Sequence, residues 1–229
     1  MRLIISILRR LAVLNYSMYK KLLLFLFIFK ISTSSAQYKW TPKTDKDGIK
    51  VFTSLVPGSK FKAIKVEADL DATAAQLVKV LLDVKGCPEW VSHTKLCTLL
   101  KQVSPSELYY YSEIDVPWPA TNRDFVAHLI VHQNPETKVV TVDGPAVPGF
   151  VPVKDDIVRI TASKGEWIIT PLEKSKVKVV YTLQVDPGGN IPAWLINMLA
   201  AEGPTRSFQG LKKQLKKPEY SQGVSFIKD

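Results

Sequence analysis

The two cysteines of this sequence, Cys87 and Cys97, have the most distinctive chemistry, and His93 lies between them. An isolated pair of thiols in one short segment predicts a disulfide if the chain matures in an oxidising compartment. Two free, buried thiols are the alternative. A zinc site is the weaker interpretation, because the segment has no C-x-x-C motif and no obvious fourth ligand. We therefore expect neither a bound metal nor a cofactor.

The histidines and the known catalytic motifs give no indication of an enzyme. His128 and His132 fall four residues apart on a predicted strand, which spans about 13 Å and prevents both from binding one metal ion. Both also fall on the polar face of that strand, which predicts solvated surface residues. The sequence contains no G-x-S-x-G elbow, phosphate-binding loop, dinucleotide fingerprint or H-E-x-x-H motif. We predict that the protein is not an enzyme.

Residues 1–36 have the composition of a secretory signal peptide. They contain six Lys or Arg residues and no acid, an apolar run over 22–29, and small residues up to Ala36. The apolar run is much shorter than the ~20 residues needed to cross a bilayer, and a buried N-terminal helix is the alternative. We predict a signal peptide over 1–36, with Met1 or Met18 as the true start, and a periplasmic or secreted protein.

The formal net charge of +10 comes mostly from this segment. Six of the 31 basic residues lie in it, so residues 37–229 have 25 basic and 21 acidic residues, a net charge of +4. That excess is too small to predict a nucleic-acid partner. The run Lys212, Lys213, Lys216 and Lys217 allows a transient membrane contact, although a solvated helix end explains it equally well. The length of 37–229 predicts one domain, and we expect a monomer.

The order of the predicted elements is typical of an α+β fold. Two β-branched runs, 48–54 and 61–70, predict a hairpin, and apolar residues at helical spacing predict a helix over 73–84 that Asp71 or Thr73 caps. Further strands are predicted over 95–103, 108–116, 123–133, 138–143, 157–162, 166–171 and 177–185. Their short connections predict an antiparallel sheet. The last helix, over 191–217, should be kinked or split at Gly203-Pro204. It is the only predicted element long enough to cover the sheet.

Alternation along three of these strands predicts which side chains face that helix. The inner faces contain hardly a charge and present Tyr110, Ile114, Phe125, Leu129, Tyr181 and Leu183. From the helix we add Trp194, Leu195, Met198 and Phe208. A fully packed core is one interpretation of this set. An apolar cavity is the other, because one helix over a strongly curved sheet leaves space that side chains do not fill.

The segment V-P-W-P-A-T-N-R-D-F-V, from Val116 to Val126, resembles a signature of the lipid-transfer domains related to steroidogenic acute regulatory protein, the START domains. Other segments resemble the family in the same order. They are D-K-D-G-I-K-V-F-T (45–53), L-L-D-V-K-G-C-P-E-W (81–90), Val158-Arg159, G-E-W-I-I-T-P (165–171) and D-P-G-G-N-I-P-A-W-L-I-N (186–197). The resemblance covers about 40–217, most of the predicted domain over 37–229.

The resemblance implies the helix-grip fold, in which a curved antiparallel sheet wraps around a long C-terminal helix and encloses an apolar tunnel for one lipid. Some members have a buried acid–arginine pair in that tunnel; here the corresponding positions are Tyr110 and Leu129, so the tunnel is more apolar. We expect Arg123 to hold the loop that carries Pro117-Trp118-Pro119, with contact to a lipid head group as its alternative role. The predicted function is a non-catalytic carrier of one lipid-like ligand. A cyclase or hydrolase on the same fold, or a lipid sensor acting through a protein partner, are the alternatives.

Overall fold

A computed structural model of the chain describes residues 38–58, 61–173 and 175–229, without the side chains of residues 193–194, 197–199 and 201. The predicted signal peptide over 1–36 lies outside the described residues, and so do the side chains of Trp194 and Met198. Within the described ranges, no helix is both long enough and apolar enough to cross a membrane.

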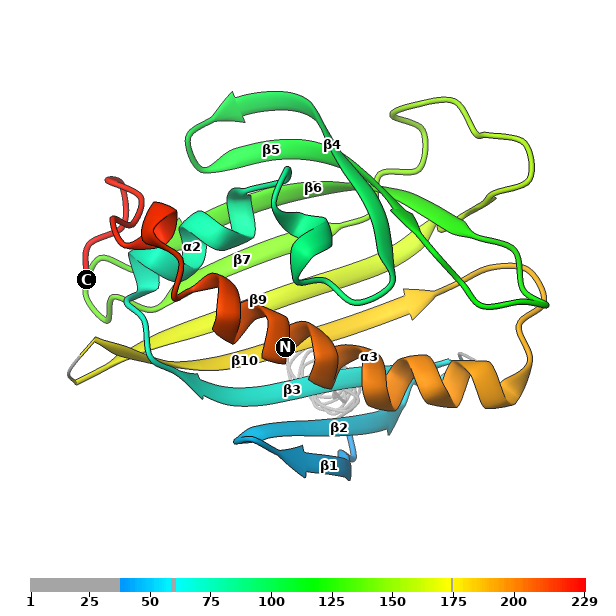
Figure 1. Cartoon of the computed structure of the whole chain (residues 1–229), viewed down its shortest axis with the longest axis horizontal. Coiled ribbons are helices and arrows are strands. Elements are labelled where there is room, and N and C mark those ends of the chain that lie inside the picture. Colours follow the sequence, from blue (N-terminus) through cyan, green and yellow to red (C-terminus); the bar gives the residue numbers. More distant parts are fainter. Residues whose placement is uncertain (1–37, 59–60, 174) are drawn as a thin grey trace, which may run out of the picture. The chain divides into compact units, whose positions relative to one another are not determined.

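Ten strands form one curved sheet (Figure 1). The strand order is β1-β2-β3-β10-β9-β7-β6-β5-β4, with β8 beside β6. Neighbouring strands are antiparallel, as predicted, except that β8 pairs with β6 in parallel. The bounds are β1 (Thr41–Lys46), β2 (Ile49–Leu55), β3 (Lys62–Leu70), β4 (Thr94–Ser104), β5 (Glu107–Ile114), β6 (Arg123–Gln133), β7 (Val140–Pro145), β8 (Val158–Arg159), β9 (Ala162–Leu172) and β10 (Lys176–Asp186).

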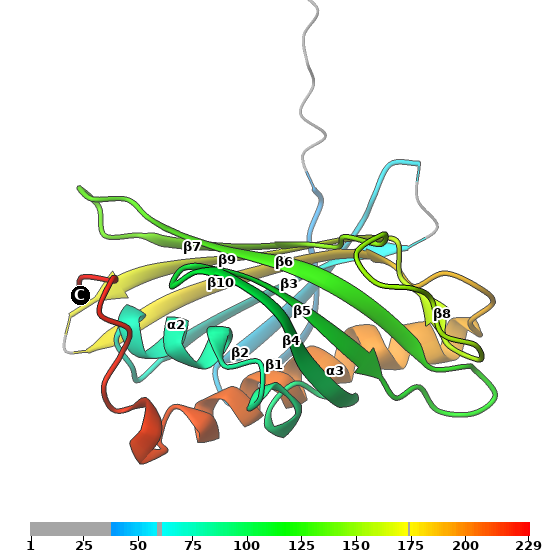
Figure 2. The same cartoon turned by 90° about the horizontal axis from the view of Figure 1, so that it is seen from above.

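Two α-helices, α2 (Ala74–Leu82) and α3 (Ala193–Gln214), lie on the same face of the sheet (Figure 2). Two short 3-10 helices, η1 (Cys87–Glu89) and η2 (Pro218–Tyr220), follow them in the chain. The start of α2 is a capping box, because Thr73 Oγ1 accepts from the Gln76 amide and Gln76 Oε1 accepts from the Thr73 amide. This arrangement confirms the predicted α+β helix-grip fold.

The expected break in the last helix is not present. Helix α3 continues through Gly203 and Pro204, so the prediction that this dipeptide would split it is wrong. Leu195, on one side of the proline, and Phe208 and Leu211, on the other, are fully buried. Packing on both sides offsets the single hydrogen bond that the proline removes.

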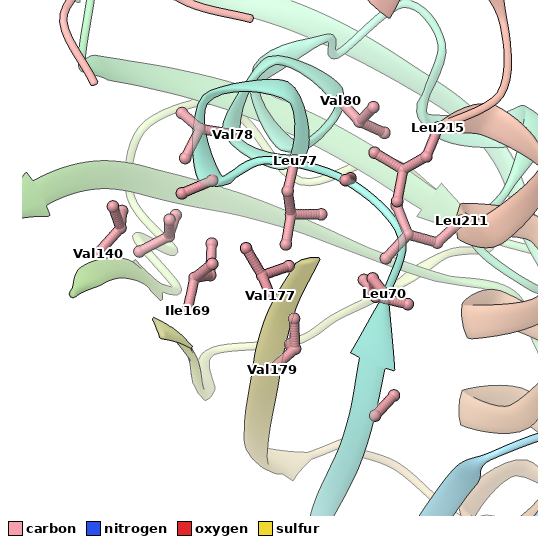
Figure 3. Packing of buried hydrophobic residues seen from close by; sticks show 14 of the residues in the cluster. Leu70, Leu77, Val78, Val80, Val140, Ile169, Val177, Val179, Leu211 and Leu215 are labelled. Atoms are coloured by element: carbon pink, nitrogen blue, oxygen red, sulfur yellow. The ribbon is translucent and has the colours of Figure 1, made fainter. Parts of the chain in front are cut away.

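The packed core lies where α2 and the C-terminal half of α3 cover the sheet (Figure 3). Leu77 and Val78 of α2 point towards the strands, and Leu211 and Leu215 of α3 approach from the side. The sheet supplies β-branched residues, which suit a pleated surface. They include Val140, Ile169, Val177 and Val179, all fully buried.

Three boundaries differ from the sequence-based expectation. Strand β1 was not predicted, and the predicted strand over 157–162 is reduced to the two residues of β8. The packed domain also continues beyond Lys217. Tyr220 and Ile227 are buried, and the Val224 amide donates to the Ala75 carbonyl at 3.1 Å, so the C-terminal tail covers α2.

Candidate ligand-binding cavity

A cavity of about 340 Å³ lies between the inner face of the sheet and the helices. Its wall comes from α2, the segment around η1, strands β4–β7, β9 and β10, and α3. The alternation of each strand places the same inner-face residues in this wall that it places towards α3. A space of this size with a mostly apolar wall is typical of a small-molecule site.

Four aromatic rings form one end of the cavity, which we call the aromatic end: Trp90, Trp167, Tyr181 and Phe208. The Trp167 ring lies 4.4 Å from the Tyr181 ring and 5.4 Å from the Phe208 ring, measured between centroids. Trp90 meets Trp167 edge to face at 6.3 Å. The rings hold one another in place, so this end presents a rigid apolar surface to a ligand.

Three polar atoms interrupt the aromatic surface. The indole Nε1 of Trp90 is buried and has no hydrogen-bond partner among the described residues. The hydroxyls of Tyr110 and Tyr181 are the other two. Burial raises the pKa of Tyr110 to about 12, and burial together with the neighbouring Tyr110 raises the pKa of Tyr181 still further. Both tyrosines therefore stay protonated near neutral pH and can offer a hydrogen bond, but neither is a useful base.

The space in the middle of the cavity depends on two glycines that face each other across β7 and β9, Gly144 and Gly165. A Cβ at Gly165 would lie 3.5 Å from the Tyr181 hydroxyl, and a Cβ at Gly144 would lie 3.1 Å from Leu129 Cδ2. Any larger side chain here would extend into the cavity. The absence of side chains at this pair keeps the space open.

The opposite end, which we call the loop end, is formed by Val116, Arg123 and Pro187. The guanidinium of Arg123 donates to the carbonyls of Thr121, Pro187 and Gly188. Arg123 therefore joins the loop before β6 to the loop before α3, and it does hold the loop of Pro117-Trp118-Pro119, as expected. Trp118 itself is 89 % exposed.

With this geometry in hand, comparison with known proteins is decisive, because a model of the START domain family matches residues 33–220. The chain belongs to the START domain family. It is therefore a member of a lipid-transfer family, and the cavity lies between the sheet and the C-terminal helix of that fold.

Relatives agree with this assignment along most of the chain. An uncharacterised protein of Pseudomonas aeruginosa is 32% identical over 190 residues, which are 83% of this chain and 93% of the relative. The phosphatidylcholine transfer protein of Mus musculus is 28% identical over 170 residues, 72% of this chain and 78% of the relative. The solved structure of a STAR-related lipid transfer protein from Xanthomonas axonopodis is similar with a TM-score of 0.72 and 34% identity, covering 78% of this chain and 99% of that one.

Most of the predicted site residues lie in the wall of this START cavity. They are Tyr110, Ile114, Arg123, Phe125, Leu129, Tyr181, Leu183 and Phe208. Leu195 is fully buried but is not among the wall residues; its side chain is already surrounded by protein and has no surface left for a ligand. That any of these residues contacts a ligand stays a prediction.

Sequence reasoning missed several wall residues. Trp90 and Trp167 fall in segments that were used only for the resemblance, and Gly144 and Gly165 have no side chain to create an apolar pattern. Glycines inside two predicted strands were the available signal, because a strand glycine often marks a close approach or an open space.

The segment from η1 to β4 is fixed by its cysteines. The structure pairs Cys87 with Cys97 in a disulfide, and Cys87, His93 and Thr94 of this segment contribute to the cavity wall. Among the described residues, no group of His, Cys, Asp and Glu side chains is arranged to hold a metal ion. Whether the two thiols oxidise in solution stays a prediction.

Two surface predictions need revision. His128 is not a solvated residue: its ring stacks on Tyr109 at 4.0 Å and bonds to Glu107 at 2.7 Å, because the loop before β8 brings Phe150 onto Tyr109. The C-terminal basic run is partly occupied within the protein. Lys212 donates to the Asp47 carbonyl and Lys217 pairs with Glu89.

Proposed function

We propose that this protein binds one lipid in its internal cavity and carries it, without catalysing a reaction on it. The observation that carries the proposal is the cavity itself, about 340 Å³ in a member of a lipid-transfer family, with an apolar and aromatic wall. The similarity to a phosphatidylcholine transfer protein supports a lipid as the ligand class.

The chemistry of the wall favours binding over catalysis. The described wall residues include no Asp or Glu, so no carboxylate is placed to act as an acid or base. The two tyrosines are held protonated by burial. His93 remains the one wall residue that titrates near neutral pH, and a single imidazole without an acidic partner is a weak basis for a cyclase or hydrolase.

A carrier must also meet a membrane, and the loop end is the part of the domain suited to that contact. Trp118 is exposed between two prolines in the loop that leads to Arg123. Exposed tryptophan is favourable at a membrane–water interface. In this proposal the protein acts as a monomer that touches the membrane transiently through this loop.

Export belongs to the same proposal and rests on the composition of residues 1–36. N-terminal sequencing of protein from the cell envelope or the medium should find Gln37 or a near neighbour first. An intact N-terminus in the cytoplasm would overturn the export proposal and leave lipid binding unaffected.

Filling the cavity tests lipid binding directly. Gly165→Leu adds a side chain that points into the cavity, and the Cβ position itself is free of clashes. We expect a folded protein whose affinity for a fluorescent phospholipid falls at least tenfold, about 1.4 kcal/mol.

Lys164→Leu is the matched control, because the same residue is added next door on the opposite, exposed face of β9. It should bind the phospholipid as the unchanged protein does. Equal affinities of the Gly165→Leu protein and the unchanged protein, with both folded by circular dichroism, would mean that lipid does not enter this cavity. Native mass spectrometry of the purified protein then identifies any lipid that it retains.

A further inference from the structure

Arg123 is a buried charge without a counter-charge. The residue is 2 % exposed, yet its three printed hydrogen bonds all go to backbone carbonyls. It forms no ion pair with any carboxylate in the described part of the chain. Burial lowers the pKa of Arg123, and no neighbouring acid acts in the opposite direction. Carbonyl dipoles satisfy some of its N–H groups but leave the positive charge uncompensated.

The next residue shows what a compensated charge looks like in the same strand. Asp124 is completely buried on the opposite face of β6, and Arg159 contacts both of its oxygens, at 2.7 and 3.0 Å. The fold therefore neutralises a buried charge on one side of this strand and leaves its neighbour unpaired on the cavity side. Removing charges from water without a partner is unfavourable, which makes the unpaired residue a candidate for a ligand contact.

The surroundings of Arg123 leave room for an anion. Gly189 lies beside the guanidinium, where a Cβ would come within 3.6 Å of Nη2. Thr94 and Arg123 are both partners of Ile114 across β4, β5 and β6, so their Cα atoms are about 10 Å apart. His93 and Thr94 thus bring an imidazole and a hydroxyl to the same end of the cavity, and no described wall residue is acidic.

The rest of the wall suits an apolar chain. Phe125, Ala127 and Leu129 follow Arg123 along the inner face of β6, and all of them line the cavity. The six residues from Arg123 to Leu129 span about 20 Å. The cavity therefore has a cation at the loop end and an uncharged path leading away from it.

We propose that the ligand is an anionic amphiphile whose phosphate or carboxylate meets Arg123 at the loop end, with its apolar chain extending along β6. This proposal rests on the proposed function, since it specifies which lipids the cavity prefers. The shared chemistry is one oxyanion on a long apolar chain. A phospholipid phosphate and a free fatty acid are its two sources.

Matched pairs of ligands test the proposal on the unchanged protein. Palmitic acid and hexadecanol differ only in the acidic group, and phosphatidic acid and diacylglycerol with the same chains differ only in the phosphate. Displacement of a fluorescent lipid should show at least tenfold tighter binding of the acidic member of one or both pairs. Tighter binding only within the phosphatidic acid pair identifies the phosphate as the source; tighter binding only of palmitic acid identifies the carboxylate.

Arg123→Gln then assigns the preference to this residue, because glutamine keeps an amide donor for the loop carbonyls and removes the charge. Its preference for the acidic member should fall to less than threefold. Arg206→Gln removes a charge from an exposed residue outside the cavity wall and should keep the full preference.

The outcomes separate the two proposals. Equal binding of the acidic and neutral members by the unchanged protein overturns the anion proposal and supports the lipid carrier. A full preference retained by a folded Arg123→Gln protein also overturns it. Failure of all four ligands to displace the probe overturns both proposals. If Arg123→Gln lowers the melting temperature strongly, the comparison within the unchanged protein still decides.

Discussion

The same strands build a solid core at one place and a cavity four residues away. On β9, Ile169 is fully buried and lies opposite Val140 of β7 and Val179 of β10 (Figure 3). Four residues earlier, Gly165 lies opposite Gly144 of β7 and Leu183 of β10. The backbone pairing is continuous through both rows, so the difference lies in the side chains alone.

The cover of the sheet differs in the same way. Above the Ile169 row, α2 inserts Leu77 and Val78 from directly opposite the strands. Above the Gly165 row the wall continues with Gly203, Pro204 and Ser207 of α3, which are small residues for a helix that covers a sheet. Small residues on both sides leave the space open, whereas large residues on both sides close it. The cavity is therefore encoded by where bulk is missing.

Truncating one leucine in each region should separate them most clearly. Leu77→Ala should lower the free energy of unfolding of the ligand-free protein by about 2–5 kcal/mol, because it opens a new cavity in a closed core. Leu129→Ala should cause a smaller loss, because one side of Leu129 already borders empty space and has fewer contacts to lose.

Urea unfolding of both ligand-free variants measures this difference. Lipid titration provides the second half of the comparison, since only Leu129→Ala should change the affinity. Equal losses of stability would show that the wall at Leu129 is packed as tightly as the core.

The disulfide should have the next largest effect, and it acts on the cavity side. Joining Cys87 to Cys97, ten residues apart, should contribute about 2–3 kcal/mol of stability by restricting the unfolded chain. Replacing both cysteines by serine should remove that contribution and lower lipid affinity, because the closed loop includes wall residues His93 and Thr94.

Reducing agent gives the matched control. It should destabilise the unchanged protein and have no effect on the double serine variant. Thiol labelling of the unreduced, denatured protein should give almost no signal. Two labelled thiols, or a stoichiometric zinc ion, would contradict the disulfide.

Trp118 contrasts the loop end with the rest of the surface. Because the side chain is 89 % exposed, Trp118→Ala should change stability by less than about 0.5 kcal/mol. Transfer of lipid between vesicles should become roughly fivefold slower, corresponding to about 1 kcal/mol of lost interfacial contact. Equilibrium affinity for the lipid should stay unchanged.

Leu55→Ala removes another exposed apolar side chain, 74 % exposed at the end of β2, and should leave transfer unaffected. If both variants slow transfer equally, the membrane contact is not specific to the loop end.

Sequence alone predicted the faces of the strands correctly. Alternation of apolar and polar residues assigned Phe125, Leu129 and Tyr181 to the inner face, and each of them lines the cavity. Alternation is a local property, so no tertiary information was needed. Strand β1, T-P-K-T-D-K, has no such alternation, and it was missed because an exposed edge strand needs no apolar face.

The filling of the inner face was not predictable in the same way. Whether Gly144 meets Gly165 or a bulky residue depends on the register between β7 and β9, which the pattern of one strand does not specify. The stacking of His128 on Tyr109 was missed for a similar reason. It depends on Phe150, which is brought there by a loop that starts elsewhere in the chain.

The smallest expected effect tests whether the open space lowers the stability of the domain. Gly165→Ala should raise the free energy of unfolding by about 0.5–1 kcal/mol, because glycine within a strand is less favourable than alanine. The new methyl group fits, with the Tyr181 hydroxyl at 3.5 Å from its Cβ. The same methyl should lower lipid affinity a few-fold by occupying part of the cavity. Gly144→Ala is the internal control, since its Cβ would meet Leu129 Cδ2 at 3.1 Å and gain less stability because that side chain must move. Thermal and urea unfolding measure the first effect and lipid titration the second. A Gly165→Ala protein that is more stable and binds lipid more weakly means that the glycine is retained for the ligand. One that is less stable, or that binds lipid unchanged, means that the glycine serves only the backbone of β9.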